Sequence, residues 1–301
     1  MPEPIVHIKS IAQLHQLLGY EKPTHPLITV IDASKLVVTR EMVGARLLSD
    51  LYYIGMKDGS CGMDYGRNQY DFEEGVLFFT APGQVVSPTR EQKANDIEGW
   101  MIYFHPDLIR KSPLGEHIDE YTFFSYDVHE ALHVSDQEKE VLTACIQQIK
   151  VECEQRIDNH SQRVITSNLE LLLNYAMRFY ERQFNTRTNI HQDTVAQFEK
   201  VLKAYFNSDQ IQNGLPPIQY FAEKLHLSPN YLSDLLRKES GRSAKDFIND
   251  YVVEKAKNML LGSNDAVSEI AYNLGFNYPH YFSRLFKTKT GMTPQQYRDA
   301  N

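Results

Sequence analysis

The sequence predicts an α+β chain of two domains: a strand-rich N-terminal domain that ends in helices, and an all-helical C-terminal domain. Three observations support this division. Short apolar runs separated by turn residues fill most of the first 110 positions. Apolar residues recur at helical spacing from residue 135 onward. The last third of the chain contains two copies of one helical pattern.

Composition indicates a globular protein. The 301 residues suffice for two cores of ordinary size, and 42% hydrophobic with 23% charged residues is a typical balance. No apolar run reaches the roughly 18 residues of a membrane span, and the N-terminus lacks the pattern of a secretory signal. The three cysteines, Cys61, Cys145 and Cys153, include no C-x-x-C pair. We therefore expect a cytoplasmic protein with no membrane partner.

Charge is distributed unevenly along the chain. The whole sequence carries −8, whereas residues 196–301 hold 13 Lys and Arg against 11 Asp and Glu, a net charge of +2. Residues 1–195 therefore carry −10. Such asymmetry is compatible with a polyanion-binding C-terminal part beside an acidic domain, although +2 is also an ordinary value for a domain.

Four runs rich in β-branched and aromatic residues predict strands at 27–31, 50–56, 75–80 and 99–104. Turn signals such as "KDGSCG", "YGRN" and "APGQ" separate them. Several short strands at this spacing predict a sandwich or a small barrel.

Two helices are predicted after these strands, at about 136–156 and 161–184. Ser135 and Glu138 form a capping box at the start of the first helix. The two helices would either join two subunits in a homodimer or only cover the strands. The polar stretch "NTRTNIHQD" (185–193) has the composition of a linker, so we assign the domains to 1–190 and 191–301.

An internal repeat dominates the C-terminal third. One copy, "FAEKLHLSPNYLSDLLRKESG", begins at Phe221, and the other, "IAYNLGFNYPHYFSRLFKTKTG", begins at Ile270. The copies align at an offset of 49 where they begin and at an offset of 50 from Tyr231 onward. The second copy therefore has one extra residue in its turn. A repeat of this quality predicts a duplicated structural unit.

Each copy predicts a helix-turn-helix unit, at about 216–240 and about 267–290. In the first unit, Ser228 is a good N-cap and Pro229 fits the first helical position. In the second unit, Gly275 supplies the left-handed conformation that a tight turn favours.

The second helix of each copy has two distinct faces. The predicted inward faces contain Tyr231, Leu232, Leu235 and Leu236, or Tyr281, Phe282, Leu285 and Phe286. The opposite faces carry Asn230, Ser233, Asp234 and Arg237, or His280, Ser283, Arg284 and Lys287. One such helix alone is more often a solvated amphipathic helix. Two copies in register, joined by a helix at 244–261, favour contacts to successive major grooves.

Residues 196–301 resemble the DNA-binding domain of the AraC/XylS family of bacterial transcription regulators. The second copy, "VSEIAYNLGFNYPHYFSRLFKTKTGMTPQQYR", is similar to the family signature. The resemblance implies seven helices with two helix-turn-helix units on double-stranded DNA. Carried over residue by residue, the base-reading positions would be Asn230, Ser233, Asp234, His280, Ser283 and Arg284. The phosphate-contacting positions would be Arg237, Lys238 and Lys287.

Asp234 departs from the expected pattern, because a basic or amide side chain is more usual in a helix that reads DNA. Its carboxylate could accept a hydrogen bond from a cytosine amino group. The stronger expectation is that Asp234 pairs with Arg237 or Lys238 on its own helix.

The same resemblance implies a cupin-like β-barrel in residues 1–190 that senses a small-molecule effector. The stretch "EEGVLFFTAPGQVVS" (73–87) looks like a cupin strand-turn-strand, but it lacks the histidines of metal-binding cupins. We therefore expect no metal and no cofactor. Aromatic residues at alternating positions could line an effector site: Tyr53, Tyr65, Phe78, Trp100 and Tyr103. Ordinary core packing of these residues, in a regulator without an effector, is the open alternative.

The resemblance also implies partners beyond the effector. We expect an activator that works with RNA polymerase, with repression as the open alternative. A homodimer would present two DNA-binding domains to paired sites on the duplex.

The stretch "VHEALHV" (128–134) places His129, Glu130 and His133 in the H-E-x-x-H spacing of zinc peptidases. In those enzymes two histidines on one helical face bind zinc. Here the preceding residues look extended and Ser135 caps a different helix, so a helix holding both histidines would be barely two turns long.

A third zinc ligand is also poorly placed. Lys139 stands where the metzincin pattern has its third histidine, and only Glu152 or Glu154 lies at a possible distance. We therefore expect no enzymatic activity and keep the zinc peptidase as a remote alternative.

Overall fold

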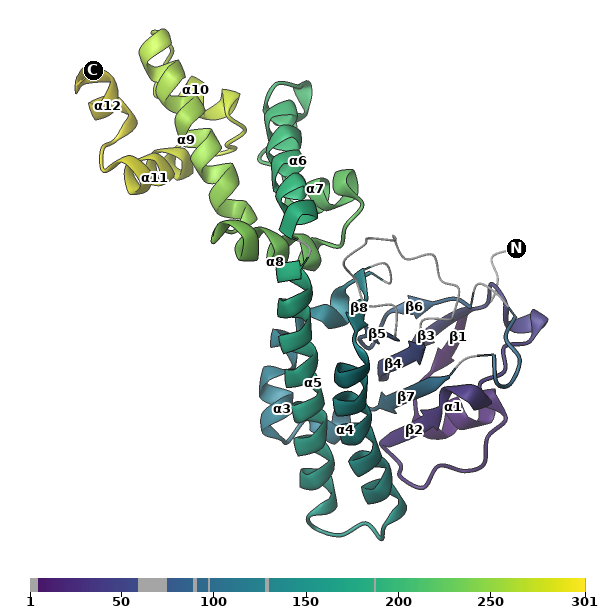
Figure 1. Ribbon diagram of the computed structural model, residues 1–301. Helices are drawn as coiled ribbons and strands as arrows, with labels where there is room; N and C mark the ends of the chain where they lie inside the picture. Colours follow the sequence, from purple (N-terminus) through teal and green to yellow (C-terminus); the bar gives the residue numbers. More distant parts are fainter. Residues whose placement is uncertain are drawn as a thin grey trace. The chain divides into compact units, whose positions relative to one another are not determined.

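The structure is a computed structural model that describes residues 5–58, 75–88, 91–96, 98–127, 130–186 and 188–300. Two compact units divide the chain, Met1–Thr186 and Arg187–Asn301 (Figure 1). The first unit combines strands and helices and the second is helical, so the predicted α+β class with two domains is confirmed. The functional boundary at 190 stays a prediction.

The described strands of the first unit form two sheets. The larger sheet is antiparallel, in the order β2 (Ile28–Asp32), β7 (Gly99–Phe104), β4 (Tyr52–Asp58), β5 (Gly75–Thr80) and β8 (Leu132–Val134). The smaller sheet has the order β1 (Ile5–Ile8), β3 (Arg46–Ser49) and β6 (Val85–Val86). The four strands predicted from the sequence correspond to β2, β4, β5 and β7.

The expected cupin-like barrel is not closed in the part of the chain that the structure describes. Strands β2 and β8 are the edges of the larger sheet, and no ladder joins them to the smaller sheet in these residues. Two edge strands are short: β8 of the larger sheet has three residues and β6 of the smaller sheet has two. The result is two open sheets rather than one continuous cylinder.

A helix that the sequence reading missed, α1 (Ile11–Leu18), lies between the first two strands. Ser10 caps its N-terminus by accepting a hydrogen bond from the Gln13 N–H, and Gly19 ends it in the left-handed conformation. Ile11 and Leu14 of α1 pack in a buried cluster with residues of both sheets, among them Met101.

Helices α4 (Asp136–Glu154) and α5 (Ser161–Thr186) correspond to the two helices predicted after the strands. The capping box of Ser135 and Glu138 is present at the start of α4. The two helices pack against each other, α4 against β2 and α5 against β8. Trp100 on β7 joins this layer, because its Nε1 donates to Oγ1 of Thr143 on α4 at 3.1 Å.

The last turn of α5 is attached to edge strand β8. The backbone N–H of His133 donates to Oε1 of Gln183 at 2.7 Å, and Nε2 of Gln183 donates to the Ala131 carbonyl at 3.1 Å. The Gln183 side chain is buried, so it takes the place of a neighbouring strand at this edge. Arg182 adds a bond to the His133 carbonyl and pairs with Glu138.

The helical unit contains seven α-helices in the described residues: α6 (Thr188–Phe206), α7 (Ile218–Leu225), α8 (Pro229–Ser240), α9 (Ala244–Gly262), α10 (Val267–Asn273), α11 (Pro279–Thr290) and α12 (Pro294–Ala300). Because α6 begins at Thr188, most of the stretch 185–193 is helical, and the division between the two units falls inside it, after Thr186. That stretch contains neither Pro nor Gly, so nothing in its backbone opposes a helix.

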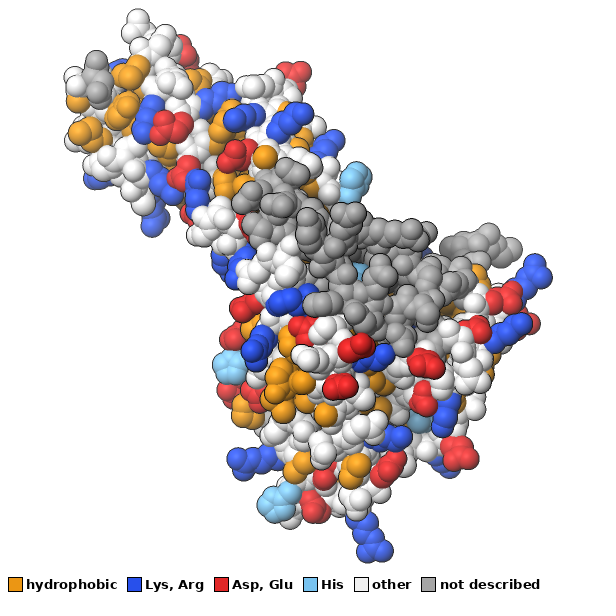
Figure 2. All heavy atoms as spheres, viewed as in Figure 1, with side chains coloured by type: hydrophobic (Ala, Val, Ile, Leu, Met, Phe, Trp, Pro, Cys, Tyr) orange, Lys and Arg blue, Asp and Glu red, His pale blue; other side chains and the backbone are white. Residues whose placement is uncertain are grey.

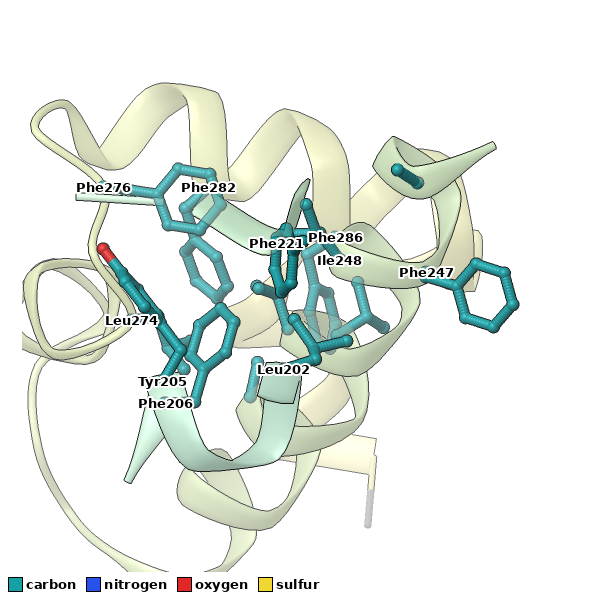
Figure 3. Close-up of a cluster of buried hydrophobic side chains, with 14 of the residues drawn as sticks. Leu202, Tyr205, Phe206, Phe221, Phe247, Ile248, Leu274, Phe276, Phe282 and Phe286 are labelled. Carbon is teal, nitrogen blue, oxygen red and sulfur yellow. The ribbon is translucent and has the colours of Figure 1, made fainter. Parts of the chain in front are cut away.

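One aromatic-rich core holds these helices together (Figure 3). Phe198 of α6 packs on Phe221 of α7 with ring centroids 4.4 Å apart. Helix α11 contributes Phe282 and Phe286, and both are buried. Helix α9 contacts α8, α10, α11 and α12 and is therefore the element shared by both repeats.

Candidate functional site

The turn of each helix-turn-helix unit is closed by the same hydrogen bond. The Leu227 N–H donates to the Ala222 carbonyl at 2.9 Å, and the Phe276 N–H donates to the Ala271 carbonyl at 3.0 Å. In both turns the preceding residue is left-handed: His226 at φ 56° and Gly275 at φ 85°. The backbone hydrogen bonds of the two turns therefore correspond to each other at an offset of 49 residues.

The extra residue of the second copy lies between this turn and the next helix. Helices α8 and α11 begin at Pro229 and Pro279, an offset of 50. Ser228 caps α8 by accepting from the Tyr231 N–H at 3.3 Å, whereas Tyr278 at the corresponding end of α11 makes no side-chain cap. The additional residue thus replaces a compact serine cap with an exposed tyrosine.

The two recognition helices, α8 and α11, also end alike. Gly241 and Gly291 are left-handed, and each N–H donates at 2.9 Å to a carbonyl four residues back. Ser240 and Thr290 bond through their hydroxyls to the preceding turn. The two helices have the same length of 12 residues, with proline at the first position and equivalent C-terminal caps.

The polar residues predicted to face DNA lie on one surface of each helix. Asn230, Arg237, Lys238, His280, Arg284 and Lys287 are exposed, and Ser233, Asp234 and Ser283 are partly buried. Each set keeps the spacing of three and four residues that places side chains on one helical face. Whether these residues contact DNA stays a prediction.

The inward face predicted for α8 is observed, and that of α11 is observed at Phe282, Leu285 and Phe286 but not at Tyr281. Tyr231 is 4% exposed in α8, whereas its repeat partner Tyr281 is 56% exposed. The packing of the two helices also differs, because α6 packs on α8, whereas the main contacts of α11 are with α9, α10 and the short α12. Tyr281 was therefore wrongly placed in the core by the sequence pattern.

Charges differ between the two helices. Helix α11 contains Arg284, Lys287 and Lys289 and no Asp or Glu, whereas α8 contains two basic and two acidic residues. Lys and Arg side chains are visible among the residues of the helical unit in Figure 2. The pairing of Asp234 with Arg237 or Lys238 stays a prediction. The second unit therefore carries the stronger positive charge.

An ion-pair network attaches α11 to the start of α9. Lys289 Nζ lies 2.8 Å from an Asp250 carboxylate oxygen and 3.9 Å from Asp246, and Asp250 also pairs with Arg242 in the turn after α8. Hydrogen bonds from the Ser243 hydroxyl and N–H lower the pKa of Asp246, opposed by partial desolvation. These contacts connect both recognition helices through α9.

Three of the predicted effector residues meet on one face of the larger sheet. Tyr53 on β4 lies opposite Tyr103 on β7, with ring centroids 4.7 Å apart, and 5.4 Å from the ring of Phe78 on β5. All three are partly buried. A Cβ on Gly55 would overlap the Tyr53 hydroxyl, so this glycine allows the Tyr53 ring to lie along its strand.

Protein atoms partly enclose this face. Desolvation raises the pKa of the Tyr103 hydroxyl above its ordinary value, and burial also raises that of Tyr20 nearby. Lys57 places its ammonium 5.2 Å from the Phe78 ring centroid. Sequence reasoning missed Tyr20 and Lys57; the alternation of β4, which puts Lys57 on the face of Tyr53, was the available signal.

The other two effector candidates do not join this group. Trp100 alternates to the opposite face of the sheet and bonds to α4 as described above. Tyr65 lies outside the described residues, as does Cys61. The candidate effector face therefore consists of Tyr53, Phe78 and Tyr103.

The H-E-x-x-H stretch does not form the helix that a zinc peptidase requires. Residues Leu132–Val134 form strand β8, and Glu130 is buried with its carboxylate accepting from the Asp127 N–H at 2.7 Å. His129 lies outside the described residues. Within the described ranges no group of three His, Cys, Asp or Glu could hold a metal ion. The peptidase alternative is therefore wrong in its structural premise.

Two family models match this chain. One, for a helix-turn-helix domain, covers residues 221–300, and the other, for an AraC-like ligand binding domain, covers residues 55–173. Both recognition helices fall in the first match. Phe78 and Tyr103 of the candidate effector face fall in the second, whereas Tyr53 lies just before it. Among the helices that the structure describes, none is long and apolar enough to cross a membrane.

Curated relatives match over part of this chain. The uncharacterised regulator YobQ of Bacillus subtilis is 37% identical over 83 residues, which is 28% of this chain and 34% of that protein. The arabinose operon regulatory protein of Escherichia coli is 33% identical over 91 residues, 30% of this chain and 31% of that protein. The chain thus spans about a third of the length of the curated relatives it matches.

A solved structure, the C-terminal domain of the response regulator AraT from Geobacillus stearothermophilus, is 31% identical and has a TM-score of 0.32. The match covers 36% of this chain and 85% of that domain. From the duplicated helix-turn-helix units and the two family matches, the chain belongs to the AraC/XylS family of transcription regulators.

Proposed function

We propose that this protein is a sequence-specific DNA-binding regulator of transcription that inserts α8 and α11 into successive major grooves. The observation that carries the proposal is the duplication of the whole unit, from the turn hydrogen bonds to the left-handed caps. Two equal helices on one connecting helix suit a duplex, whose major groove returns to the same side about every 34 Å.

Each polar residue of the recognition helices has a proposed role. Base edges are contacted by Asn230, Ser233, Asp234, His280, Ser283 and Arg284. Phosphates are contacted by Arg237, Lys238 and Lys287. Arg284 is the strongest candidate for base recognition, because it is exposed on a helix without carboxylates and its guanidinium can bind guanine through two hydrogen bonds.

The test is selection of bound sequences from a randomised duplex pool, followed by affinity measurements across a salt series. Wild type should enrich a motif with two elements about 10 base pairs apart. Arg284→Ala should lower affinity for that motif about 5- to 100-fold. Arg40→Ala is the matched control, since Arg40 is equally exposed but lies in the N-terminal unit. Its affinity should equal that of wild type.

Two results would count against DNA recognition. No enrichment over random sequence would remove the proposal, and equal losses for both arginine variants would assign the effect to net charge. A salt slope without sequence preference would indicate non-specific binding to phosphates only.

The N-terminal unit is proposed to hold a small-molecule effector against Tyr53, Phe78 and Tyr103. Support comes from the match to a ligand-binding domain and from three partly buried rings on one sheet face. An effector must change DNA affinity by the same factor by which DNA changes effector affinity. If the protein has no effector, small molecules that stabilise the N-terminal unit would leave its affinity for DNA unchanged.

A homodimer is proposed through the helices α4 and α5, which expose apolar side chains at Val151, Val164 and Leu171. Leu171→Glu should lower the molar mass in light scattering from dimer to monomer without unfolding the chain. An unchanged mass would contradict this interface. Action on DNA as an activator further implies RNA polymerase as a partner and the cytoplasm as the place of action.

A further inference from the structure

Three tyrosines of the second helix-turn-helix unit are unusually exposed. Tyr278 is 61% exposed, Tyr281 is 56% exposed and Tyr272 on α10 is 57% exposed. A large ring that remains in water gives up the stabilisation of burial, and clustered exposed rings commonly mark a surface used for binding. The equivalent of Tyr281 in the first unit is buried, so the repeat itself does not require this exposure.

Two of these rings, Tyr278 and Tyr281, form a group at the N-terminal end of α11. The ring of Tyr281 lies 4.2 Å from that of His280 and 6.1 Å from that of Tyr278, the latter in an edge arrangement. His280 also contacts Tyr278 at 5.8 Å. Mutual contacts restrict each side chain, so the Tyr281 ring is held in place before any partner arrives.

The charge around this group selects the partner. Tyr281 precedes Arg284 by three residues and Thr288 by seven, so the three share one exposed side of α11. No acidic residue occurs on this helix, and its basic residues include Arg284 and Lys287. An aromatic ring surrounded by positive charge on a recognition helix suits DNA, since the first residues of such helices approach base edges.

We infer that Tyr281 reads thymine, by packing its ring on the C5-methyl group in the major groove. The methyl is the one apolar group that a base pair presents there, and apolar side chains distinguish thymine through it. This inference rests on the proposed function and extends it to a residue that the repeat pattern had assigned to the core. Tyr278 acts as a positioning residue that orients the ring, and His280, itself proposed to contact a base edge, packs on the same ring.

The experiment removes the methyl group and the ring separately. In the motif selected by wild type, each thymine of the second element is replaced by uracil, which lacks the C5-methyl but keeps the base-pairing atoms. Affinity is measured for wild type, Tyr281→Ala, Tyr281→Phe and Tyr272→Ala. Tyr272 is the matched control, because it is equally exposed but lies on α10 rather than on the recognition helix.

At one thymine, loss of the methyl group should weaken wild-type binding about fourfold, because the free energy of burying one apolar carbon is lost. Tyr281→Ala should bind the thymine and uracil duplexes equally. Tyr281→Phe and Tyr272→Ala should keep the fourfold difference. Circular dichroism of all four proteins should coincide, because the substituted side chains are exposed.

Several results would overturn the inference. The same uracil penalty in Tyr281→Ala as in wild type would assign the methyl contact to another residue. No penalty at any thymine would show that no methyl is read. If selection yields no motif at all, the proposed DNA recognition itself fails, a result distinct from a motif that is insensitive to the methyl group.

Discussion

Gly275 is predicted to be the least replaceable glycine of the helical unit. Its backbone is left-handed at φ 85°, and a Cβ there would lie 2.9 Å from Cδ1 of Ile211 and 3.1 Å from the carbonyl carbon of Gly214. Gly291 is the matched control, because it has nearly the same φ of 79° but no atom within 4 Å of a Cβ. The two glycines therefore separate backbone strain from steric overlap.

The magnitude follows from these two contributions. The left-handed conformation costs an alanine about 1–2 kcal/mol, which applies to both positions. Overlap with packed atoms adds about 1–3 kcal/mol at Gly275 alone, since a backbone carbonyl carbon cannot move as a flexible side chain does. Gly291→Ala should thus lower the free energy of unfolding by about 1–2 kcal/mol and Gly275→Ala by about 2–5 kcal/mol.

Urea unfolding followed by far-UV circular dichroism measures the stability of the helices. Fluorescence of Trp100, the single tryptophan, reports the N-terminal unit and should not change in either variant. Stability losses that agree within about 0.5 kcal/mol in the two alanine variants would contradict this prediction. Equal losses would mean that the loop around Gly214 yields to the added methyl group.

Three further predictions concern other contacts. Gln183→Leu removes the buried side chain that bonds to the His133 N–H and the Ala131 carbonyl. It should lower the free energy of unfolding by about 2–4 kcal/mol, measured by urea unfolding with tryptophan fluorescence, and a loss near zero would contradict this. The pKa of Asp246 is lowered from 3.8 by hydrogen bonds at the start of α9, so its contribution is complete above that pH and disappears as pH falls through the lowered value. Asp246→Asn should therefore flatten the acid loss of stability below pH 3.8, and an unchanged pH profile would exclude this role. Desolvation, with two neighbouring glutamates, raises the pKa of Cys153 to about 12. Near neutral pH, iodoacetamide should therefore label the Cys153 peptide only as fast as the N-terminal unit unfolds, and rapid labelling detected by mass spectrometry would contradict this.

Local sequence signals predicted the helical unit well. The caps at Ser135 and Ser228, the proline starts and the turn at Gly275 are all present, because each depends on a few neighbouring residues. The repeat offset even located the extra residue in the second turn. Such features need no knowledge of distant packing.

The failures arose where tertiary contacts decide the outcome. Tyr281 follows the apolar pattern of Tyr231, but α6 packs on α8 whereas α11 packs mainly on α9, α10 and α12. The same pattern leaves one ring buried and one exposed. Strand β8 (Leu132–Val134), which holds the second histidine of the H-E-x-x-H stretch, pairs with β5 and was not among the four predicted strands. Trp100 was grouped with Tyr53, although the register of β7 and β4 places them on opposite faces.

Helix α9 sets a strict limit on insertions and deletions between the two recognition helices. It is one continuous helix of 19 residues, about 28 Å long. Each added residue would turn everything after it by about 100° and advance it by about 1.5 Å, so a single insertion would point α11 away from the duplex. Only about seven residues, close to two turns, would restore its direction while moving it about 10 Å further along. Evolution can therefore change which bases this protein recognises residue by residue, but the distance between the two recognised elements changes only in large steps.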